Sequence, residues 1–197
     1  MTRKHLDIGC GAVPRNPYGC DEVHGVDLAT GKTDIGAFIK CANLSLEGIP
    51  HPDSSFDSIS AFNFLEHVPR ILVTKSGDRT RFPFVELMNE IFRVLKPGGR
   101  LYALTPAYPH PSAFQDPTHV NIITIDTWLY FCGPQTLARM YGFNGNFEML
   151  RNEWVVERDA FSAVATFNWQ ARWRRERRRI KGELSHIVWE FVSHKSD

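Results

Sequence analysis

A strand-like run that ends in two closely spaced glycines constrains the fold of this chain most strongly. The run His5–Ile8 leads directly into Gly9, Cys10 and Gly11. Glycine adopts positive φ without strain and has no Cβ, so such a bend lets a ligand approach the backbone closely. In open α/β sheets, ligands bind beyond the C-terminal ends of the strands. We therefore expect a ligand site where this first strand ends.

Short apolar runs alternate with helical patterns along the rest of the chain. The clearest helical pattern spans Pro83–Leu95, and the sequence Lys96–Gly99 stops it with a cation, a proline and two glycines. A second helix is predicted for Pro134–Tyr141. The later strand-like runs are Glu22–Val26, Ser58–Phe62, Arg100–Thr105, Phe147–Val155 and His186–Ser193. This alternation predicts an α/β fold with a doubly wound, mostly parallel sheet that is covered on both faces.

Length and composition are those of an ordinary soluble domain. A chain of 197 residues suits one core, so we expect a single domain over residues 1–197. The formal net charge of +1 argues against a surface that attracts polyanions as a whole. Four cysteines without a CxxC pair are typical of reduced thiols. The first glycine bend comes too early for a signal peptide and no apolar run could span a bilayer, so we expect a cytoplasmic protein.

Two nucleotide-binding signatures resemble parts of the chain but fail on chemistry. A dinucleotide fingerprint needs a third glycine where this chain has Pro14, because a helix N-terminus must pack closely there to hold a pyrophosphate. Gly31-Lys32-Thr33 is similar to the end of a phosphate loop, but the position five residues before Gly31 is Val26, so the cradle of backbone amides is missing. These mismatches argue against dinucleotide and nucleoside triphosphate sites.

Two aspartates at strand ends suit a nucleoside that carries no phosphate. Asp27 ends the second strand, where an ionised carboxylate can accept hydrogen bonds from ribose hydroxyls, each worth about 1.5–3 kcal/mol. Asp7 lies at the end of the first strand and is expected to orient the loop or a ligand's ammonium group. S-adenosylmethionine has no phosphate, and a glycine bend beside an acid fits its amino-acid portion and its ribose.

Six stretches match the motifs of one known family in the same order along the chain. They are Asp7–Gly11, Val26–Leu28, Asn43–Leu44, Ser55–Ile59, Leu65–Val68 and Leu95–Leu101. These stretches resemble the motifs of class I S-adenosylmethionine-dependent methyltransferases, of the small type-11-like kind, and the resemblance covers the chain up to about Gly145. It implies a seven-stranded, Rossmann-like sheet, S-adenosylmethionine as the cofactor and S-adenosylhomocysteine as the product.

The resemblance also implies which residues contact the cofactor. Asn43 and Leu44 should meet the adenine, and Phe62 and Asn63 should lie near the methionine moiety, with His67 at the start of a helix beside it. Asn43 replaces an aspartate that is frequent in the family, which keeps an acceptor oxygen but loses the charge. Packing alone is the alternative role of Phe62 and His67. The full predicted set is Asp7, Gly9, Cys10, Gly11, Asp27, Leu28, Asn43, Leu44, Phe62, Asn63 and His67.

The chain departs from the family between Gly11 and Val23. Relatives have a helix there, whereas this chain has two prolines and a glycine within Pro14–Gly19. Prolines inside a helix remove a hydrogen bond and clash with the preceding turn. We therefore predict a loop with at most one helical turn, which leaves one side of the cofactor exposed.

A proline-rich loop after the predicted strand Arg100–Thr105 holds the best candidates for a general base. Methyl transfer from a sulfonium is an in-line displacement, so alignment does most of the work and a base helps when the acceptor is a hydroxyl. The loop carries His110, Asp116 and His119, and we expect one histidine over the methyl group with Asp116 orienting its imidazole. The alternative is that Asp116 and His119 only tie down the loop through an Asx-type turn. Since no third and fourth ligands are evident at suitable spacing, we predict no metal site.

The segment 160–182 is expected to form a basic helical insertion before the last strand. Its densest part is Arg172–Arg179, beside Trp169 and Trp173. Basic residues interleaved with aromatic ones can bind nucleic acid, but a solvated helical face is the favoured interpretation.

The acceptor is the least constrained part of the prediction. The loop Tyr108–Val120 resembles small methyltransferases associated with bacterial surface polysaccharides, which favours a sugar hydroxyl. One alternative is a small metabolite or natural product. Another is a non-catalytic, cofactor-binding accessory subunit that contacts RNA or a protein partner through the basic segment. The sequence leaves a homodimer open.

Overall fold

One mostly parallel sheet organises the protein, as a computed structural model shows for residues 2–29, 31–32, 38–163 and 169–195. Its strand order is β3-β4-β2-β1-β5-β8-β10-β9. The strands are β1 (Lys4–Ile8), β2 (Glu22–Asp27), β3 (Gly31–Lys32), β4 (Phe38–Cys41), β5 (Phe56–Phe62), β8 (Leu95–Pro106), β9 (Phe147–Val155) and β10 (His186–Ser193). The predicted α/β, doubly wound fold class is confirmed, with two-residue β3 added at the edge beyond the seven strands expected.

The parallel strands bring their C-terminal ends to the same edge of the sheet. Strands β4, β2, β1, β5 and β8 pair in parallel, while β10 runs antiparallel to both β8 and β9. Ile8 pairs with Val26 on one side and with Ala61 on the other. The residues that follow these three strands therefore lie beside one another, which is where ligands bind in open α/β sheets.

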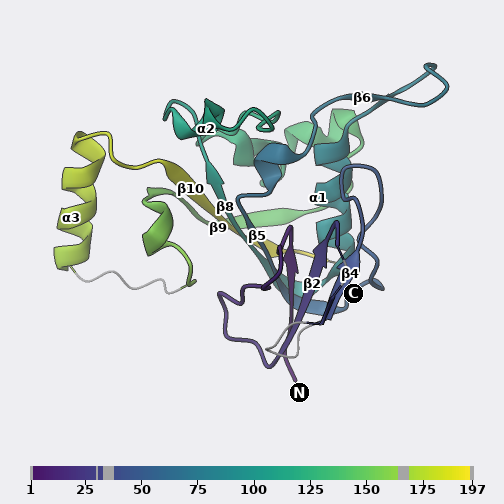
Figure 1. The fold of residues 1–197 in the computed structure, drawn as a ribbon, viewed down its shortest axis with the longest axis horizontal. Helices are drawn as coiled ribbons and strands as arrows, with labels where there is room; N and C mark the ends of the chain where they lie inside the picture. The colour runs from purple at the N-terminus through teal and green to yellow at the C-terminus, as the bar shows by residue number, and fades with distance from the viewer. Residues whose placement is uncertain (1, 30, 33–37, 164–168, 196–197) are drawn as a thin grey trace.

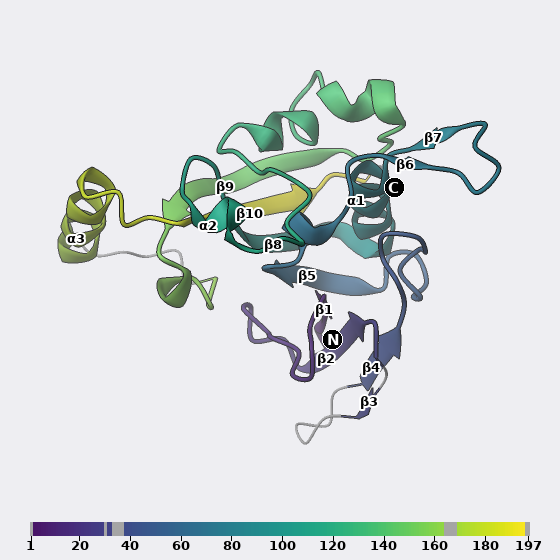
Figure 2. The same ribbon diagram turned by 45° about the horizontal axis from the view of Figure 1, so that its top comes forward.

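Helix α1 (Pro83–Val94) covers one face of the sheet (Figures 1 and 2). Its proline at the first helical position has no N–H to leave unpaired, which favours helix initiation there. Its buried residues Leu87, Met88 and Ile91 recur at a spacing of three or four residues. They join a core that includes fully buried strand residues such as Ile59. The boundaries predicted for this helix agree with the structure to within one residue.

Loops cover the opposite face of the sheet. Phe62, Tyr102 and Val188 form a second buried cluster there, against which Tyr18 of the first crossover packs. Residues 9–21 contain turns and bends but no helix, so the prediction of a loop in place of the family's first helix is confirmed.

Three short elements differ from the sequence prediction. The helix expected to begin at Glu66 is a single 3-10 turn, η1 (Leu65–His67), because Pro69 holds the preceding Val68 in an extended conformation with φ −81° and ψ 120°. A hairpin of β6 (Leu72–Val73) and β7 (Thr80–Arg81) follows this turn. The predicted helix Pro134–Tyr141 is shorter and 3-10 in type, η3 (Leu137–Tyr141).

The basic segment includes helix α3 (Trp169–Ile180), which lies at one end of the molecule in Figures 1 and 2. Arg175 forms an ion pair with Glu153 of β9, and Arg178 pairs with Asp159 of η4 (Glu157–Asp159). These acidic partners balance part of the positive run locally. Within the part of the chain that the structure describes, no helix combines the length and apolar character needed to cross a membrane.

Candidate functional site

The glycine bend after β1 is shaped by backbone conformation and by one aromatic ring. Gly9 has φ +66° and donates its backbone N–H to the carbonyl of Val26 at 2.8 Å. A Cβ at Gly9 would lie 2.3 Å from Cδ2 of Phe64, so this ring packs directly over the bend. Gly11 has φ +59°, and a Cβ there would meet no atom within 4 Å. Both conformations favour glycine, but only Gly9 is also held by close packing.

The carboxylate of Asp27 points toward this bend. Oδ2 of Asp27 accepts a hydrogen bond from the Gly11 backbone at 2.8 Å, and Oδ1 accepts one from the Leu28 backbone at 2.7 Å. Two N–H donors stabilise the ionised carboxylate, and each oxygen keeps a further lone pair. Asp27 therefore has acceptor capacity left for ribose hydroxyls at the mouth of the bend.

A cavity of about 610 Å³, which we call the cofactor cavity, lies over the ends of β1, β2 and β4. This volume is within the range of roughly 300–1,000 Å³ that is usual for cofactor sites. The predicted residues that line it are Gly9, Asp27, Leu28, Asn43, Leu44 and His67. Others that line it, among them Phe64, Leu46 and Leu72, supply apolar wall. An acid beside a glycine bend and apolar wall fits a nucleoside without phosphates.

The side-chain oxygen of Asn43 already has one partner. It accepts a hydrogen bond from the backbone of Ser45 at 3.1 Å, which is an Asx-type turn. Its remaining lone pair can still receive an adenine amino group. The next residue, Leu44, is buried and lines the same cavity.

Asp7 lies beneath the bend rather than in the cavity wall. It is fully buried and accepts hydrogen bonds from the Arg15 backbone at 2.8 Å and from Oγ of Ser60 at 2.5 Å. Burial raises the pKa of Asp7 to about 6, against which these hydrogen bonds act. Of the two roles expected for Asp7, the structure favours orientation of the loop.

Four more of the predicted cofactor residues lie outside this lining, for different reasons. Gly11 contributes its N–H to Asp27. Cys10 is buried against Gly25, where an added Cβ would lie 2.6 Å from its sulfur. Phe62 is buried in the loop-covered face, with the Arg15 guanidinium 4.9 Å from its ring centroid. This placement favours the packing role for Phe62, while Asn63 lines a different cavity.

That second cavity, which we call the polar cavity, has a volume of about 580 Å³. Its wall includes three imidazoles and three carboxylates, from His67, His119, His186, Glu66, Asp116 and Glu157. His67 also lines the cofactor cavity, so the two cavities meet at this residue. The wall thus carries mainly groups that donate or accept hydrogen bonds or protons.

Glu66 is a candidate that the sequence analysis missed. Only 2% of its surface is exposed, and within the described residues neither carboxylate oxygen has a hydrogen-bond partner. Burial raises the pKa of Glu66 to about 8, and nearby Glu157 and Asp116 act in the same direction. Oε1 lies 4.0 Å from Nε2 of His119. An isolated buried carboxylate beside an imidazole is a usual sign of a functional site.

Two of the three predicted catalytic residues, Asp116 and His119, line the polar cavity, and His110 does not. Asp116 accepts hydrogen bonds from the backbone and the hydroxyl of Thr118, and that hydroxyl contacts Nδ1 of His67 at 2.9 Å. Asp116 therefore forms the Asx-type turn and, through Thr118, orients His67 rather than His119. His110 stays outside the polar cavity's lining, where its Nδ1 contacts Ser112 at the start of α2 (Ser112–Gln115).

One ligand atom each from Glu66, His67 and His119 lies within 4.8 Å of the others. We call these three residues the polar cluster. A third metal ligand is not evident in the sequence around Asp116 and His119, because the two remaining members of the cluster, Glu66 and His67, follow β5 instead. The three residues of the polar cluster come together because η1 packs against the loop after β8.

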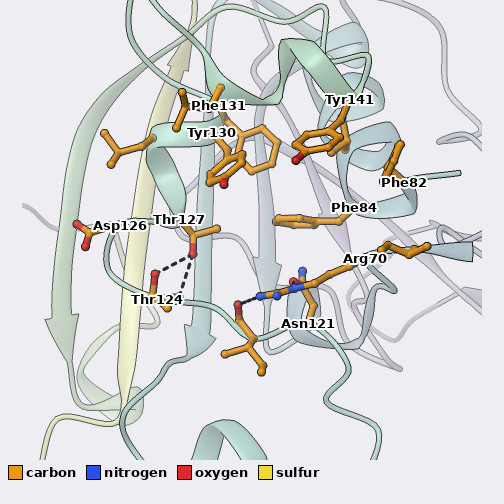
Figure 3. A pocket seen from close by; sticks show the side chains of 15 residues that line it. Arg70, Phe82, Phe84, Asn121, Thr124, Asp126, Thr127, Tyr130, Phe131 and Tyr141 are labelled. Atoms are coloured by element: carbon orange, nitrogen blue, oxygen red, sulfur yellow. Dashed lines mark hydrogen bonds between the residues drawn. The ribbon is translucent and has the colours of Figure 1, made fainter. Parts of the chain in front are cut away.

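A third cavity, of about 520 Å³, is lined mainly by apolar side chains, among them several aromatic rings (Figure 3). Figure 3 shows Phe84, Phe131 and Tyr141 around it, with Arg70 along one side. Arg70 donates a hydrogen bond to Oδ1 of Asn121 at 2.8 Å, so it also ties the wall together. We call this the aromatic cavity. It includes residues of η2 (Thr127–Tyr130) and shares no lining residue with the other two cavities described above.

Comparison with known proteins agrees with this geometry. A methyltransferase domain family matches residues 6–103, about half of the chain. A demethylmenaquinone methyltransferase from Geobacillus sp. (strain WCH70) is 27% identical over 124 residues, which cover 54% of this chain and 47% of that protein. The match thus spans about half the length of this curated relative.

Two solved structures share the fold over almost the whole chain. One is a methyltransferase from Haloferax volcanii in complex with the Trm112 methyltransferase activator, with a TM-score of 0.59, 14% identity, and coverage of 98% of this chain and 84% of that one. The other is an S-adenosylmethionine-dependent methyltransferase from Mesorhizobium loti, with a TM-score of 0.55, 17% identity, and coverage of 96% and 90%. The chain therefore belongs to the family of class I S-adenosylmethionine-dependent methyltransferase domains.

Proposed function

We propose that this methyltransferase binds S-adenosylmethionine in the cofactor cavity and methylates a hydroxyl group held in the polar cavity. The observation that carries the proposal is the position of His67, which lines both cavities. A methyl donor in one cavity and an acceptor in the other would meet at this residue. Methyl transfer requires such alignment, which is worth about 7–11 kcal/mol in intramolecular reactions.

Different residues of the cofactor cavity would bind different parts of the cofactor. Asp27 would accept hydrogen bonds from the ribose, and Asn43 with Leu44 would hold the adenine. Gly9 lets the amino-acid portion approach the backbone. When bound, the cofactor supplies a sulfonium methyl group with a good leaving group, so the protein's own contribution is positioning and exclusion of water.

The polar cavity would orient the acceptor and accept its proton. Six of its residues carry imidazole or carboxylate groups, and Asn63, Ser112 and Gln115 add further hydrogen-bonding side chains. Such a wall suits a compound with several hydroxyls, and we propose a sugar as the acceptor. The hydroxyl proton must leave as the methyl group arrives, and the polar cluster is the group of titratable residues nearest to the junction at His67.

The aromatic cavity favours a second candidate acceptor, a small apolar aromatic compound. Phe84, Phe131 and Tyr141 offer ring faces and edges of the kind that hold such compounds (Figure 3). The curated relative, named as a demethylmenaquinone methyltransferase, supports a small-molecule acceptor. The polar cavity ranks first here because it shares His67 with the cofactor cavity, whereas the aromatic cavity shares no lining residue with it.

The test combines cofactor binding with methyl transfer. Calorimetric titration with S-adenosylhomocysteine should show one site, and methyl transfer from labelled S-adenosylmethionine should be measured with free sugars and with hydroxylated aromatic compounds. We expect transfer to sugars, and its loss in Asp27→Ala. Asp21→Ala is the matched control, because Asp21 also accepts a hydrogen bond from a backbone N–H, that of Arg3, but lies outside the cavity lining. Transfer to aromatic compounds alone would move the acceptor to the aromatic cavity.

A further inference from the structure

We propose that the polar cluster of Glu66, His67 and His119 is a binding site for one divalent transition-metal ion. Two imidazoles and one carboxylate are a common ligand set for zinc and for other ions of its class. The three residues come from two segments, η1 and the loop after β8, which the fold brings to one wall of the polar cavity. The assignment of a catalytic task to this ion rests on the proposed function, whereas ion binding itself does not.

The hydrogen bonds around His67 leave Nε2 available as a ligand. The Thr118 hydroxyl donates its only hydrogen to Asp116, so it must accept from Nδ1–H of His67. The neutral imidazole then has its lone pair on Nε2. A metal-binding histidine usually donates a hydrogen bond from its other ring nitrogen to a carboxylate or a similar acceptor. Here the link from His67 to the Asp116 carboxylate passes through the Thr118 hydroxyl.

His119 is held in the same tautomer by a different partner. Its Nδ1 lies 3.3 Å from the carbonyl oxygen of Ala113, which can only accept, so Nδ1 carries the hydrogen. The lone pair is again on Nε2, and this nitrogen lies 4.0 Å from Oε1 of Glu66. Both histidines therefore offer acceptor atoms, as a metal ion requires.

Glu66 is the observation that sets this cluster apart from an ordinary group of polar residues. Its carboxylate is 98% buried, lines the polar cavity, and has no hydrogen-bond partner among the described residues. Leaving a buried carboxylate without a partner is costly. A cation between three acceptor groups removes that cost and their mutual repulsion.

The spacing of the cluster is close to that of a metal site. Bonds of about 2.0–2.2 Å place two ligand atoms of a tetrahedral zinc ion roughly 3.4 Å apart. The 4.0 Å between Glu66 and His119 must therefore shorten by about 0.6 Å, and separations in the cluster of up to 4.8 Å must shorten by up to about 1.4 Å. Three protein ligands leave at least one position open toward the cavity, as in catalytic zinc sites.

An ion at this position would give the polar cavity a specific task in the proposed reaction. Coordination lowers the pKa of a hydroxyl, as it does for water. The proton would pass through the remaining carboxylates and imidazoles of the polar cavity to solvent, the oxygen would form the new bond to the methyl carbon, and the electrons of the broken carbon–sulfur bond would leave on sulfur. A sugar with neighbouring hydroxyls would then be favoured, because two oxygens can share the ion.

The experiment measures ion binding without any turnover. The full chain, freed of metal with a chelator, is titrated with Co²⁺ while visible absorption is recorded, and Zn²⁺ is used as the competitor. We expect one Co²⁺ per chain, with weak visible bands and without the intense near-ultraviolet band of thiolate ligation. Glu66→Gln and His119→Ala should weaken binding at least 100-fold, and Thr118→Val about 10- to 100-fold, as losses of supporting residues do. His194→Ala, which changes an exposed histidine paired with Glu148, should leave binding unchanged.

Two outcomes would overturn the proposal. One is a lack of stoichiometric Co²⁺ uptake by the wild type, which would mean that the cluster only shares protons. The other is uptake that persists in both Glu66→Gln and His119→Ala. Thermal unfolding of the metal-free variants establishes that they fold, and Thr118→Val gives an independent measurement outside the ligand set. Titration with S-adenosylhomocysteine reports on the cofactor cavity alone, so failure of the proposed function and failure of this inference give different patterns.

Discussion

The two cavities that meet at His67 differ in the structural elements and in the polar groups that form them. The cofactor cavity is formed where three parallel strands end, and its key carboxylate, Asp27, is held by two backbone N–H groups. The polar cavity is formed by short helical turns, loops and the ends of β8 and β10, and its most buried carboxylate, Glu66, has no such donor within the described residues. A binding site can be made from backbone geometry, whereas a reactive site needs side chains whose charge is not fully compensated.

One deeply buried acid, Asp7, lies beneath the glycine bend, and another, Glu66, lines the polar cavity, and the two differ in their hydrogen-bond partners. Asp7 supports the glycine bend through its bonds to Arg15 and Ser60. Glu66 lacks such bonds, and its pKa is raised to about 8, against about 6 for Asp7. Asp7 is thus suited to hold structure, and Glu66 to bind a cation or proton.

The largest expected effect separates the two cavities by function. His119→Ala should slow methyl transfer by about 10²–10⁴-fold, the usual cost of losing assistance to proton removal. The affinity for S-adenosylhomocysteine should stay within about twofold, because His119 is not among the residues that line the cofactor cavity. Single-turnover kinetics and calorimetry measure the two quantities. A collapse of cofactor affinity in this variant would show that His119 is structural, and His194→Ala controls for loss of a histidine.

The next effect tests the bend itself. Gly9→Ala should lower the free energy of unfolding by about 2–5 kcal/mol, since positive φ costs an alanine about 1–2 kcal/mol and forced overpacking adds about 1–3 kcal/mol. The overpacking arises because the new Cβ would lie 2.3 Å from Phe64. Urea unfolding measures the difference.

Gly11→Ala is the matched control for that variant. Gly11 has nearly the same φ, but an added Cβ meets no atom within 4 Å. It should therefore cost only the conformational part, about 1–2 kcal/mol. Equal losses in both variants would mean that Phe64 does not constrain the bend.

The same contrast explains what could be predicted from the sequence. Gly9 and Asp27 lie within or directly after their strands, so their neighbours follow from strand pairing once the sheet is recognised. Strand β10 and helix α1 carry strong apolar patterns, and their predicted bounds agree with the structure to within one residue, as do those of the more polar β9. Local patterns of this kind require no knowledge of distant contacts.

The remaining features depend on long-range contacts or on weak patterns. Strand β4 was not predicted because its continuous apolar run, Phe38 and Ile39, is too short to indicate a strand by itself. The pairing of Glu66 with His119 joins residues that are 53 positions apart, and the loop after β8 is irregular in sequence. Pro69, which ends η1 after one turn, is present in the sequence, but the resemblance to the family predicted a longer helix there. Motif analysis can therefore single out individual residues of such a cluster without predicting that the fold brings them together.

A pH effect sharpens the contrast between the buried acids. Asp7 has a folded-state pKa of about 6, raised by burial above the usual value of 3.8. Its contribution to stability is therefore full below pH 4 and is lost as the pH rises through 6. Between pH 4 and pH 7, wild type should lose on the order of 2–3 kcal/mol relative to Asp7→Asn. Urea unfolding across this range measures the difference, and parallel pH profiles for both proteins would contradict the assignment.

The smallest effect concerns Asp27, the acid that we propose binds the ribose. Asp27→Asn keeps one acceptor oxygen but removes the charge, so affinity for S-adenosylhomocysteine should fall by about 10- to 100-fold, corresponding to a charged hydrogen bond of about 1.5–3 kcal/mol. Stability should change little, because the amide oxygen can still accept from either the Gly11 or the Leu28 backbone. Asp21→Asn is the control for loss of a carboxylate that accepts from a backbone N–H. If Asp27→Asn bound the product as tightly as wild type, its carboxylate would serve only to close the bend, and the ribose would need another partner in the cavity.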